Sequence, residues 1–506
     1  MTTAAAASAD ASQLPRTLGE LRASGYRSRS IKDEVRENLI RALREKRPLF
    51  PGIVGFDKTV VPQVVNALLA RHDIILLGLR GQAKTRIARQ LTDLLDEWSP
   101  LLADFPLNED PLNPVSRGAR LFVETHGDAT PIRWLHRAQR YAEKLATPDV
   151  SMSDLIGDID PIKAANLKLD LANEQVIHFG IIPRTNRGLF CINELPDLSP
   201  RIQVGLLNIM QERDIQIRGF PVRLPIDVLM VFTANPEDYT NRGSIITPLK
   251  DRIESQVHTH YPQKLDDAMT ITAQEAWVGR DSGVHVHVPR FLLEAVEETA
   301  FQARKSEFLD QSSGVSARLP IALLENVVSN AERRALLNAT DRVAARPVDF
   351  QQAVAAVTGK VELVYQGEQE GAVNVGRHLV GQGLKAVFDR LLPDPGGEGG
   401  ESADDADVFG PYKPILDHFN GGGRVRLDDV MAAKDLLGAL RAIPGLEKLT
   451  RKHLTLDQPE LELPPAMEFV LEGLHQSRML GKDDLDGTIN YYDALGDMMN
   501  DLSETF

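Results

Sequence analysis

The chain has 506 residues, of which 42% are hydrophobic and 25% charged, and these values are typical of globular proteins. They exclude a mostly disordered chain, and the length suits about three domains. The formal net charge of −15 argues against a protein that coats nucleic acid, so we expect no nucleic-acid partner. Cys191 is the only cysteine, which excludes an intrachain disulfide. We find no signal peptide and no apolar run long enough to span a membrane, and we therefore expect a cytoplasmic protein without membrane insertion.

The N-terminal part, 1–48, combines a tail with a helical segment. The tail, Met1–Ser12, is rich in Ala, Ser and Thr and is expected to be disordered, whereas about 14–47 is helical and mixed in charge. An α/β core of 49–262 follows. Helical stretches separate its short apolar strands, which predicts a parallel sheet with helices on both faces. The strands are expected at Asp73–Leu77, Leu189–Ile192, Val228–Thr233 and Ser255–His258.

The second half of the chain is predicted to be helical. A lid of 263–392 contains Pro289, Pro320 and Pro347 near helix starts or breaks. An acidic, Gly-rich linker of 393–410 contains no Lys or Arg and is expected to be solvated. Beyond it, 411–506 is predicted to form a separate, acidic helical domain.

The strongest motif is Gly78-Leu-Arg-Gly81-Gln82-Ala83-Lys84-Thr85, which follows the strand and opens a helix over Thr85–Leu95. A strand, a Gly-containing loop and a helix form the context of a phosphate-binding loop, in which backbone N–H groups face the phosphates. Lys84 would neutralise charge on the β- and γ-phosphates, and the Thr85 hydroxyl would bind Mg²⁺. Ala83 stands where the strict pattern has glycine. These residues predict an ATP site.

Two further strands end in polar residues. Gly188-Leu-Phe-Cys-Ile is followed by Asn193 and Glu194, which could reach the Mg²⁺ and the attacking water, with Glu194 polarising the water. An Asp is usual at the first of these two positions; Asn193 keeps an oxygen acceptor but loses the charge, which predicts weaker support for the metal. Asn235, in Thr233-Ala-Asn-Pro, could bind the γ-phosphate or orient the water, although Asn before Pro also forms simple turns.

Together these motifs resemble the AAA+ ATPases, and more closely the branch of magnesium-chelatase subunit I and MoxR. The resemblance covers about Ile53 to Thr358. Ile53-Val54-Gly55 is similar to the adenine-side motif, and the branch has the same alanine before the lysine of the phosphate loop. Asp154–Asp160 and Phe179–Gly188 resemble the helix-2 insert, and Gln211–Arg223 reads as a hairpin with Gly219 at its turn.

The resemblance also implies the roles of two arginines. Leu249-Lys-Asp-Arg252 is similar to the arginine-finger motif, and Ser316-Ala-Arg318, opening a helix, is similar to sensor 2. The family therefore implies a ring, expected to be a hexamer, in which ATP and Mg²⁺ lie between Lys84 of one subunit and Arg252 of the next. It also implies remodelling or metal insertion, often with a partner that bears a von Willebrand A domain.

Several residues have simpler interpretations. Arg252 could pair with the adjacent Asp251, and Arg242 is a weaker second candidate for the finger. The pairs His258/His260 and His285/His287 could each supply two metal ligands on a strand, but no Cys or nearby carboxylate completes them, so half-exposed strand histidines are expected. Cys191 is expected to be a small core residue. The C-terminal acids Asp483, Asp484, Asp486 and Asp493 lack calcium-loop spacing and are expected to form a solvated face.

Three alternative functions differ in class. A true magnesium-chelatase motor subunit fits the core but leaves the C-terminal extension unexplained. An enhancer-binding transcription activator would need a Gly-Ala-Phe-Thr-Gly-Ala loop and a helix-turn-helix, and we find neither. A nucleotide-binding scaffold with weak hydrolysis is favoured by Asn193.

Overall fold

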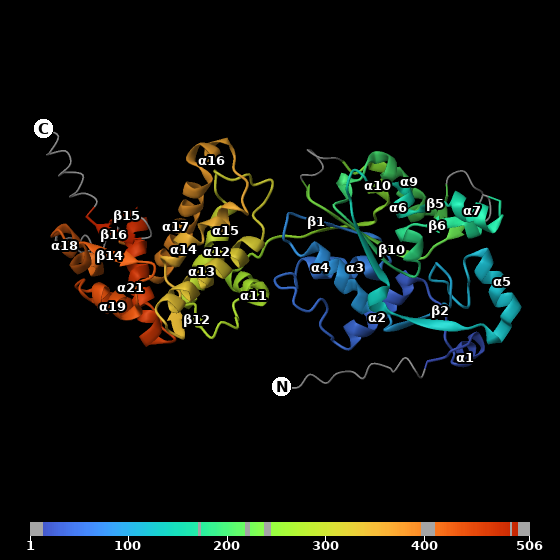
Figure 1. Cartoon of the computed structure of the whole chain (residues 1–506), viewed down its shortest axis with the longest axis horizontal. Helices are drawn as coiled ribbons and strands as arrows, with labels where there is room; N and C mark the ends of the chain where they lie inside the picture. The colour runs from blue at the N-terminus through green and yellow to red at the C-terminus, as the bar shows by residue number, and fades with distance from the viewer. Residues whose placement is uncertain are drawn as a thin grey trace. The chain divides into compact units, whose positions relative to one another are not determined.

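The computed structural model describes residues 14–170, 174–217, 223–236, 244–395, 410–485 and 488–493. The chain divides into two compact units, Met1–His260 and Tyr261–Phe506 (Figure 1). The expected tail, the hairpin turn at Gly219, Arg242, Asp486 and most of the acidic linker lie outside the described residues. Among the helices that are described, none combines the length and apolarity that crossing a bilayer requires.

The first unit is built on a parallel sheet of five strands, which numbered along the chain follow the order 5-1-4-3-2. From one edge to the other these are β11 (Ser255–His258), β1 (Ile74–Leu77), β10 (Val228–Ala234), β7 (Gly188–Asn193) and β4 (Tyr141–Leu145). Four of them confirm the predicted strands. The sequence did not predict β4, because this edge strand is not an apolar run: it contains a Glu-Lys pair, which suits an exposed sheet edge.

Alternating apolar residues of the central strands pack on the two faces of the sheet. Ile74 and Leu76 of β1 share one core with α2, α3 and α4, whereas Ile75 and Leu77 share the other with α9 and α10. The helices are α2 (Ile31–Arg44), α3 (Val60–Leu69), α4 (Lys84–Gln90), α9 (Pro200–Glu212) and α10 (Thr247–Arg252). The predicted helix Thr85–Leu95 is α4 followed by a 3₁₀ turn, η2 (Leu91–Leu94).

Helix α2 is part of the core rather than of a separate N-terminal segment. Lys32 forms a buried ion pair with Asp73, which precedes β1, at 2.9 Å. Glu34 accepts two hydrogen bonds from the buried guanidinium of Arg140, each at 2.7 Å. Burial opposes ionisation of Glu34, but the bonds to Arg140 outweigh it and lower the pKa of this carboxyl. Breaking such a buried pair would leave an uncompensated charge, so these contacts fix α2 against the sheet.

An insertion that the sequence did not predict lies between α4 and β4. Strands β2 (Trp98–Leu102) and β3 (Ile132–His136) pair in antiparallel fashion, and α5 (Arg117–His126) lies between them in the chain. The first helix, α1 (Leu18–Ala23), packs its leucines on this insertion.

Two antiparallel strand pairs and three short helices complete the first unit. The predicted helix-2 insert contains the pair β5–β6, and the predicted hairpin over Gln211–Arg223 is confirmed by antiparallel pairing of β8 with β9, which extends two residues further than expected. The elements are α6 (Met152–Leu155), β5 (Gly157–Ile159), α7 (Pro161–Leu167), β6 (Ile177–Phe179), α8 (Ile181–Arg184), β8 (Asp214–Gln216) and β9 (Arg223–Pro225).

The second unit begins with a helical region. Pro289 precedes α12, Pro320 lies in the first turn of α13 and Pro347 precedes α14, close to where starts were expected. The elements up to the linker are α11 (Leu265–Glu275), β12 (His285–His287), α12 (Arg290–Ala303), α13 (Arg318–Leu337), β13 (Arg342–Ala344), α14 (Asp349–Gln352), α15 (Val354–Thr358), α16 (Tyr365–Glu370) and α17 (Ala372–Leu391). Together with the parallel sheet of the first unit, this region confirms the predicted α/β fold class with a helical region after the core.

The described residues after the linker share one hydrophobic core with the lid, from Phe291 to Tyr491, whereas the sequence suggested a domain of their own. They also contain a three-stranded antiparallel sheet that the sequence did not predict. The elements are α18 (Lys413–Asn420), β14 (Val425–Asp428), α19 (Ala433–Arg441), α20 (Leu446–His453), α21 (Pro459–Gln476), β15 (Gly481–Leu485) and β16 (Thr488–Tyr492).

Helix α21 is buried on all sides over Glu462–Leu474. A helix with this pattern belongs in the centre of a core, where a charge needs a partner. Each of its three buried glutamates has a basic partner: Glu462 pairs with His287 at 2.5 Å, Glu468 with Arg346 at 2.7 Å and Glu472 with Lys482 at 2.7 Å.

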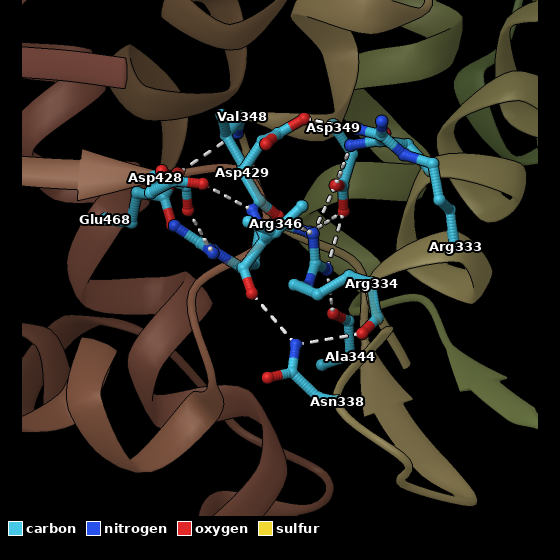
Figure 2. A network of polar contacts seen from close by, with 12 residues as sticks. Arg333, Arg334, Asn338, Ala344, Arg346, Val348, Asp349, Asp428, Asp429 and Glu468 are labelled. Atoms are coloured by element: carbon cyan, nitrogen blue, oxygen red, sulfur yellow. Dashed lines mark hydrogen bonds and ion pairs between the residues drawn. The ribbon is translucent and has the colours of Figure 1, made fainter. Parts of the chain in front are cut away.

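Figure 2 shows the polar network around Arg346. Arg334 of α13 forms an ion pair with Asp349 at 2.5 Å, and both side chains are buried. Arg346 donates to Glu468 of α21 and to the backbone oxygen of Asp428 in β14, the latter at 3.1 Å. The network therefore joins the lid to the segment after the linker through buried charged contacts.

Candidate functional site

The loop between β1 and α4 has a conformation that constrains its residues. A Cβ on Gly78 would lie 2.0 Å from Thr259 Oγ1, so no side chain fits there. Gly81 has φ +75°, and Ala83, which caps α4, has φ +56° and ψ +14°. Both lie in the left-handed region, which an L side chain such as alanine adopts at a cost of about 1–2 kcal/mol. This explains why the strict pattern has glycine at the position of Ala83.

Lys84 places its ammonium group inside this loop. The side chain is buried, and Nζ donates to the backbone oxygen of Leu79 at 3.1 Å and to Asn235 Oδ1 at 2.8 Å. It also donates to the backbone oxygen of Gly78. Asn235 directly follows β10, so the structure brings together two candidate residues that are far apart in the sequence.

Asn193 is the last residue of β7, the neighbour of β10 in the sheet, and Glu194 follows it. Asn193 Oδ1 accepts a hydrogen bond from Thr85 Oγ1 at 3.4 Å, which joins the end of β7 to the first turn of α4. Both Asn193 and Glu194 are half-buried, and the Glu194 backbone is left-handed with φ +56° and ψ +51°. The candidate residues of three parallel strands therefore meet at their carboxyl ends, where ligands bind in open α/β sheets.

Gln82 is oriented toward the protein interior rather than outward. Its Oε1 accepts a hydrogen bond from Thr259 Oγ1 at 2.7 Å, and the side chain is buried. Only its backbone N–H could therefore take part in binding a phosphate.

Val54 and Gly55 lie on a loop near the end of β11. Gly55 has φ +79°, and the ring of the next residue, Phe56, packs edge-on against His260 at 5.0 Å. His260 Nε2 also lies 2.7 Å from Thr59 Oγ1. Because β11 is the neighbour of β1, this arrangement brings the expected adenine-side motif to the strand beside the loop.

Arg252, at the end of α10, has partners other than the adjacent acid. Its Nε donates to Gln211 Oε1 of α9 at 3.0 Å, and Nη1 donates to the backbone oxygen of Pro248 at 2.8 Å. The separation from Asp251 is 4.0 Å, and that carboxylate is largely exposed. The surface ion pair of Arg252 with Asp251 is therefore a minor contact of Arg252.

Arg318 belongs to the second unit. It is the first residue of α13, as the sequence predicted, its side chain is exposed, and its backbone N–H donates to Ser316 Oγ at 3.1 Å.

The remaining candidates have structural partners. Within the described residues, no group of three or more His, Cys, Asp or Glu could hold a metal ion. His258 is exposed on β11, His285 is exposed on β12, and His287 contacts Glu462. Cys191 lies in the core, where burial raises the pKa of its thiol to about 12. The thiol is therefore protonated at neutral pH and is not a nucleophile.

Sequence reasoning missed two hydroxyls that contact candidate residues. Thr259 binds Gln82, and Thr233 binds Asn193 and Glu194. A signal for Thr233 was present, since it is the one polar side chain in the otherwise apolar strand β10. A buried hydroxyl needs a partner, and the ends of the adjacent strands supply it.

The chain matches no protein-family model. Over 54 residues, 11% of this chain and 11% of the relative, it is 37% identical to the hydrogenase transcriptional regulatory protein HoxA of Cupriavidus necator. NtrX from Brucella abortus aligns over 57% of this chain and 54% of its own, with 12% identity and a TM-score of 0.34, and has also been solved with ATP. The BchI–BchD complex of magnesium chelatase aligns over 64% of this chain and 99% of that chain, with 17% identity and a TM-score of 0.34.

The chain thus spans about one tenth of HoxA and about half of NtrX. Its fold is a parallel α/β sheet with a loop of phosphate-binding type at the carboxyl edge of that sheet.

Proposed function

We propose that the protein binds ATP at the loop of Gly78–Thr85 and hydrolyses it as the motor of an oligomeric ring. The observation that carries this proposal is the contact of Lys84 Nζ with Asn235 Oδ1 at 2.8 Å, beside the paired Thr85 and Asn193. Phosphoryl transfer needs a cation that binds the phosphates, a group that orients the water and oxygen ligands for Mg²⁺. Lys84, Asn235 and the pair of Thr85 and Asn193 would supply these groups at one edge of the sheet. Lys84 binds the β- and γ-phosphates, and Asn235 binds the γ-phosphate or orients the water.

The oxygen donors at this edge fit a magnesium ion. The hydroxyl of Thr85, the amide oxygen of Asn193 and the carboxylate of Glu194 belong to the ligand class that Mg²⁺ prefers. When bound with ATP, Mg²⁺ neutralises phosphate charge. Thr85 would hold the ion directly. The amide oxygen of Asn193 accepts a hydrogen bond from the Thr85 hydroxyl and so orients the Thr85 oxygen. Glu194 polarises the attacking water.

Arg252 is proposed to act on the ATP of a neighbouring subunit, as the resemblance to the AAA+ finger motif implies. The contacts with Gln211 and Pro248 hold the guanidinium at the end of α10, where its charge is available to a second copy. Arg318 is proposed as the lid residue that senses nucleotide. The ring is expected to be a hexamer that remodels a protein, or drives metal insertion, with a von Willebrand A domain protein as a candidate partner.

The test is phosphate release by the purified chain with Mg²⁺ and ATP, compared with Lys84→Ala. We expect turnover by the wild type and loss of binding or turnover in the variant. A variant that keeps full activity would reject the loop as the site. A wild type that binds ATP but releases no phosphate would instead favour the scaffold with weak hydrolysis, the alternative that Asn193 suggests.

The shared site is tested by mixing Lys84→Ala with Arg252→Ala. In a mixed ring, some interfaces combine an intact Lys84 with an intact neighbouring Arg252, so activity should partly return. An unchanged lack of activity at every mixing ratio would reject action between subunits. Porphyrin metallation with candidate partners separates the true chelatase subunit from a remodelling motor.

A further inference from the structure

Thr233 is a polar residue in the most buried part of the sheet. It lies near the carboxyl end of β10, which runs between β1 and β7, and it is 1% exposed. The neighbouring strand residues Val231, Phe232 and Ala234 are buried and apolar. A hydroxyl at this depth is costly unless its hydrogen bonds are satisfied. Its partners therefore indicate what it contributes.

The hydroxyl of Thr233 makes two hydrogen bonds, one to Asn193, the last residue of β7, and one to Glu194, which follows the strand. Oγ1 accepts the backbone N–H of Glu194 at 3.2 Å and lies 3.3 Å from Asn193 Oδ1. Because a backbone N–H can only donate, the hydroxyl proton is available for the Asn193 oxygen. Asn193 Oδ1 also accepts from Thr85. A continuous chain of hydrogen bonds thus runs from Glu194 through Thr233 and Asn193 to Thr85.

The conformation of Glu194 explains why such a contact is needed. Its φ of +56° lies in the left-handed region, which costs a non-glycine residue about 1–2 kcal/mol and persists only where the surroundings impose it. The bond from its N–H to Thr233 is one such constraint. Asn193 in turn lacks the charge of an aspartate, so its orientation toward Thr85 depends on hydrogen bonds alone.

We propose that Thr233 is a positioning residue for the hydrolysis proposed above: its hydroxyl fixes the backbone of Glu194 and the amide oxygen of Asn193. The inference rests on the proposed function, because it gives Glu194 and Asn193 their tasks. Thr233 contacts neither phosphate nor water itself. Its loss should therefore impair the chemical step and the response to Mg²⁺ more than the binding of nucleotide.

The experiment compares four variants with the wild type. Thr233→Val keeps the shape but removes both bonds, Thr233→Ala removes them without adding a methyl group, and Thr233→Ser keeps the hydroxyl. Thr450→Val is the matched control, since Thr450 is also fully buried but its hydroxyl binds only its own helix, at Leu446 O. Each variant is measured for kcat, for the Mg²⁺ concentration at half-maximal rate, for affinity toward a fluorescent ATP analogue and for melting temperature.

We expect Thr233→Val and Thr233→Ala to lower kcat by about 10- to 100-fold, the loss that misplaced groups typically cause, and to raise the Mg²⁺ requirement. Nucleotide affinity should stay within about twofold, and Thr233→Ser should recover most of the rate.

Three results would overturn the inference. The first is a kcat within about twofold of wild type in Thr233→Val. The second is failure of Thr233→Ser to recover the rate. The third is a combined loss of rate, nucleotide affinity and melting temperature in both Thr233→Val and Thr233→Ala, with a fall in melting temperature larger than that of Thr450→Val. That result would show that Thr233 has a purely structural role. A wild type without hydrolysis would reject the proposed function itself, and the inference with it, whereas an active wild type with an equally active Thr233→Val would reject the inference alone.

Discussion

Glu468→Gln should destabilise the second unit strongly, because it removes the counter-charge of a buried arginine. Glu468 Oε2 accepts from Arg346 Nε at 2.7 Å, and Oε1 accepts from the backbone N–H of Val348 at 3.1 Å. The two side chains are 3% and 0% exposed. A glutamine has one oxygen for these two donors and no charge. Breaking a buried pair on one side typically costs about 3–5 kcal/mol.

For a unit of this size, 1 kcal/mol shifts the melting temperature by about 2–4 °C, so we expect a fall of roughly 6–20 °C. The assay is calorimetry, with urea unfolding followed by circular dichroism. Asp389→Asn is the control, because Asp389 forms a more exposed helical pair with Lys385 at 2.7 Å, and such pairs contribute about 0.3–0.5 kcal/mol. If Glu468→Gln shifts the melting temperature no more than this control does, α21 is not buried against the lid in the native protein.

Three further predictions concern single residues. Burial opposes ionisation of Glu472, but Lys482 and nearby hydrogen bonds outweigh this effect and lower the pKa of Glu472 to about 2. The ionised Glu472 therefore stabilises the folded state above the unfolded-state pKa of about 4.3, and this stabilisation is lost as the pH falls toward 2. In Glu472→Gln, the melting temperature should accordingly depend less on pH between about 2 and 4.3. Ala83→Gly should relieve the left-handed strain and, after the entropy cost of glycine, stabilise the first unit by about 0.5 kcal/mol, whereas Ala83→Val should destabilise it; thermal melts that rank valine above glycine would contradict this. Asn193→Asp restores a carboxylate beside Thr85 and should lower the Mg²⁺ concentration for half-maximal hydrolysis by about tenfold; an unchanged metal titration would show that Asn193 does not support the ion.

The sequence predicted the central strands and the loop because local signals define both. An apolar run such as Ile74–Leu77 is buried on both faces, and the spacing from Gly78 to Thr85 is fixed by the turn into a helix. The edge strand β4 gave no such signal, since the charged residues Glu143 and Lys144 interrupt it. The insertion with β2 and β3 was missed for a different reason: its pairing joins residues 30 to 38 positions apart in the chain, from Leu102 with Ile132 to Trp98 with His136, which no local pattern reveals.

The contacts between distant segments could not be read from the sequence. Lys84 and Asn235 were separate candidates, and only the sheet order brings them within 2.8 Å. The acidic composition of the C-terminal part also favoured a separate domain, which the structure does not show. Glu462, Glu468 and Glu472 contribute to that composition but are buried and paired. Composition cannot distinguish a solvated glutamate from one with a buried basic partner.

The most direct test of the proposed site compares ATP binding with ATP hydrolysis in Glu194→Gln. Binding is measured at equilibrium with a fluorescent ATP analogue, and hydrolysis is measured as phosphate release in a single turnover. Because the amide cannot polarise the water but leaves Lys84 and Thr85 intact, we predict affinity within about twofold of wild type and hydrolysis slowed by at least about 100-fold. Hydrolysis at the wild-type rate would contradict the account, because the water would then be activated by a group other than Glu194 at the end of β7.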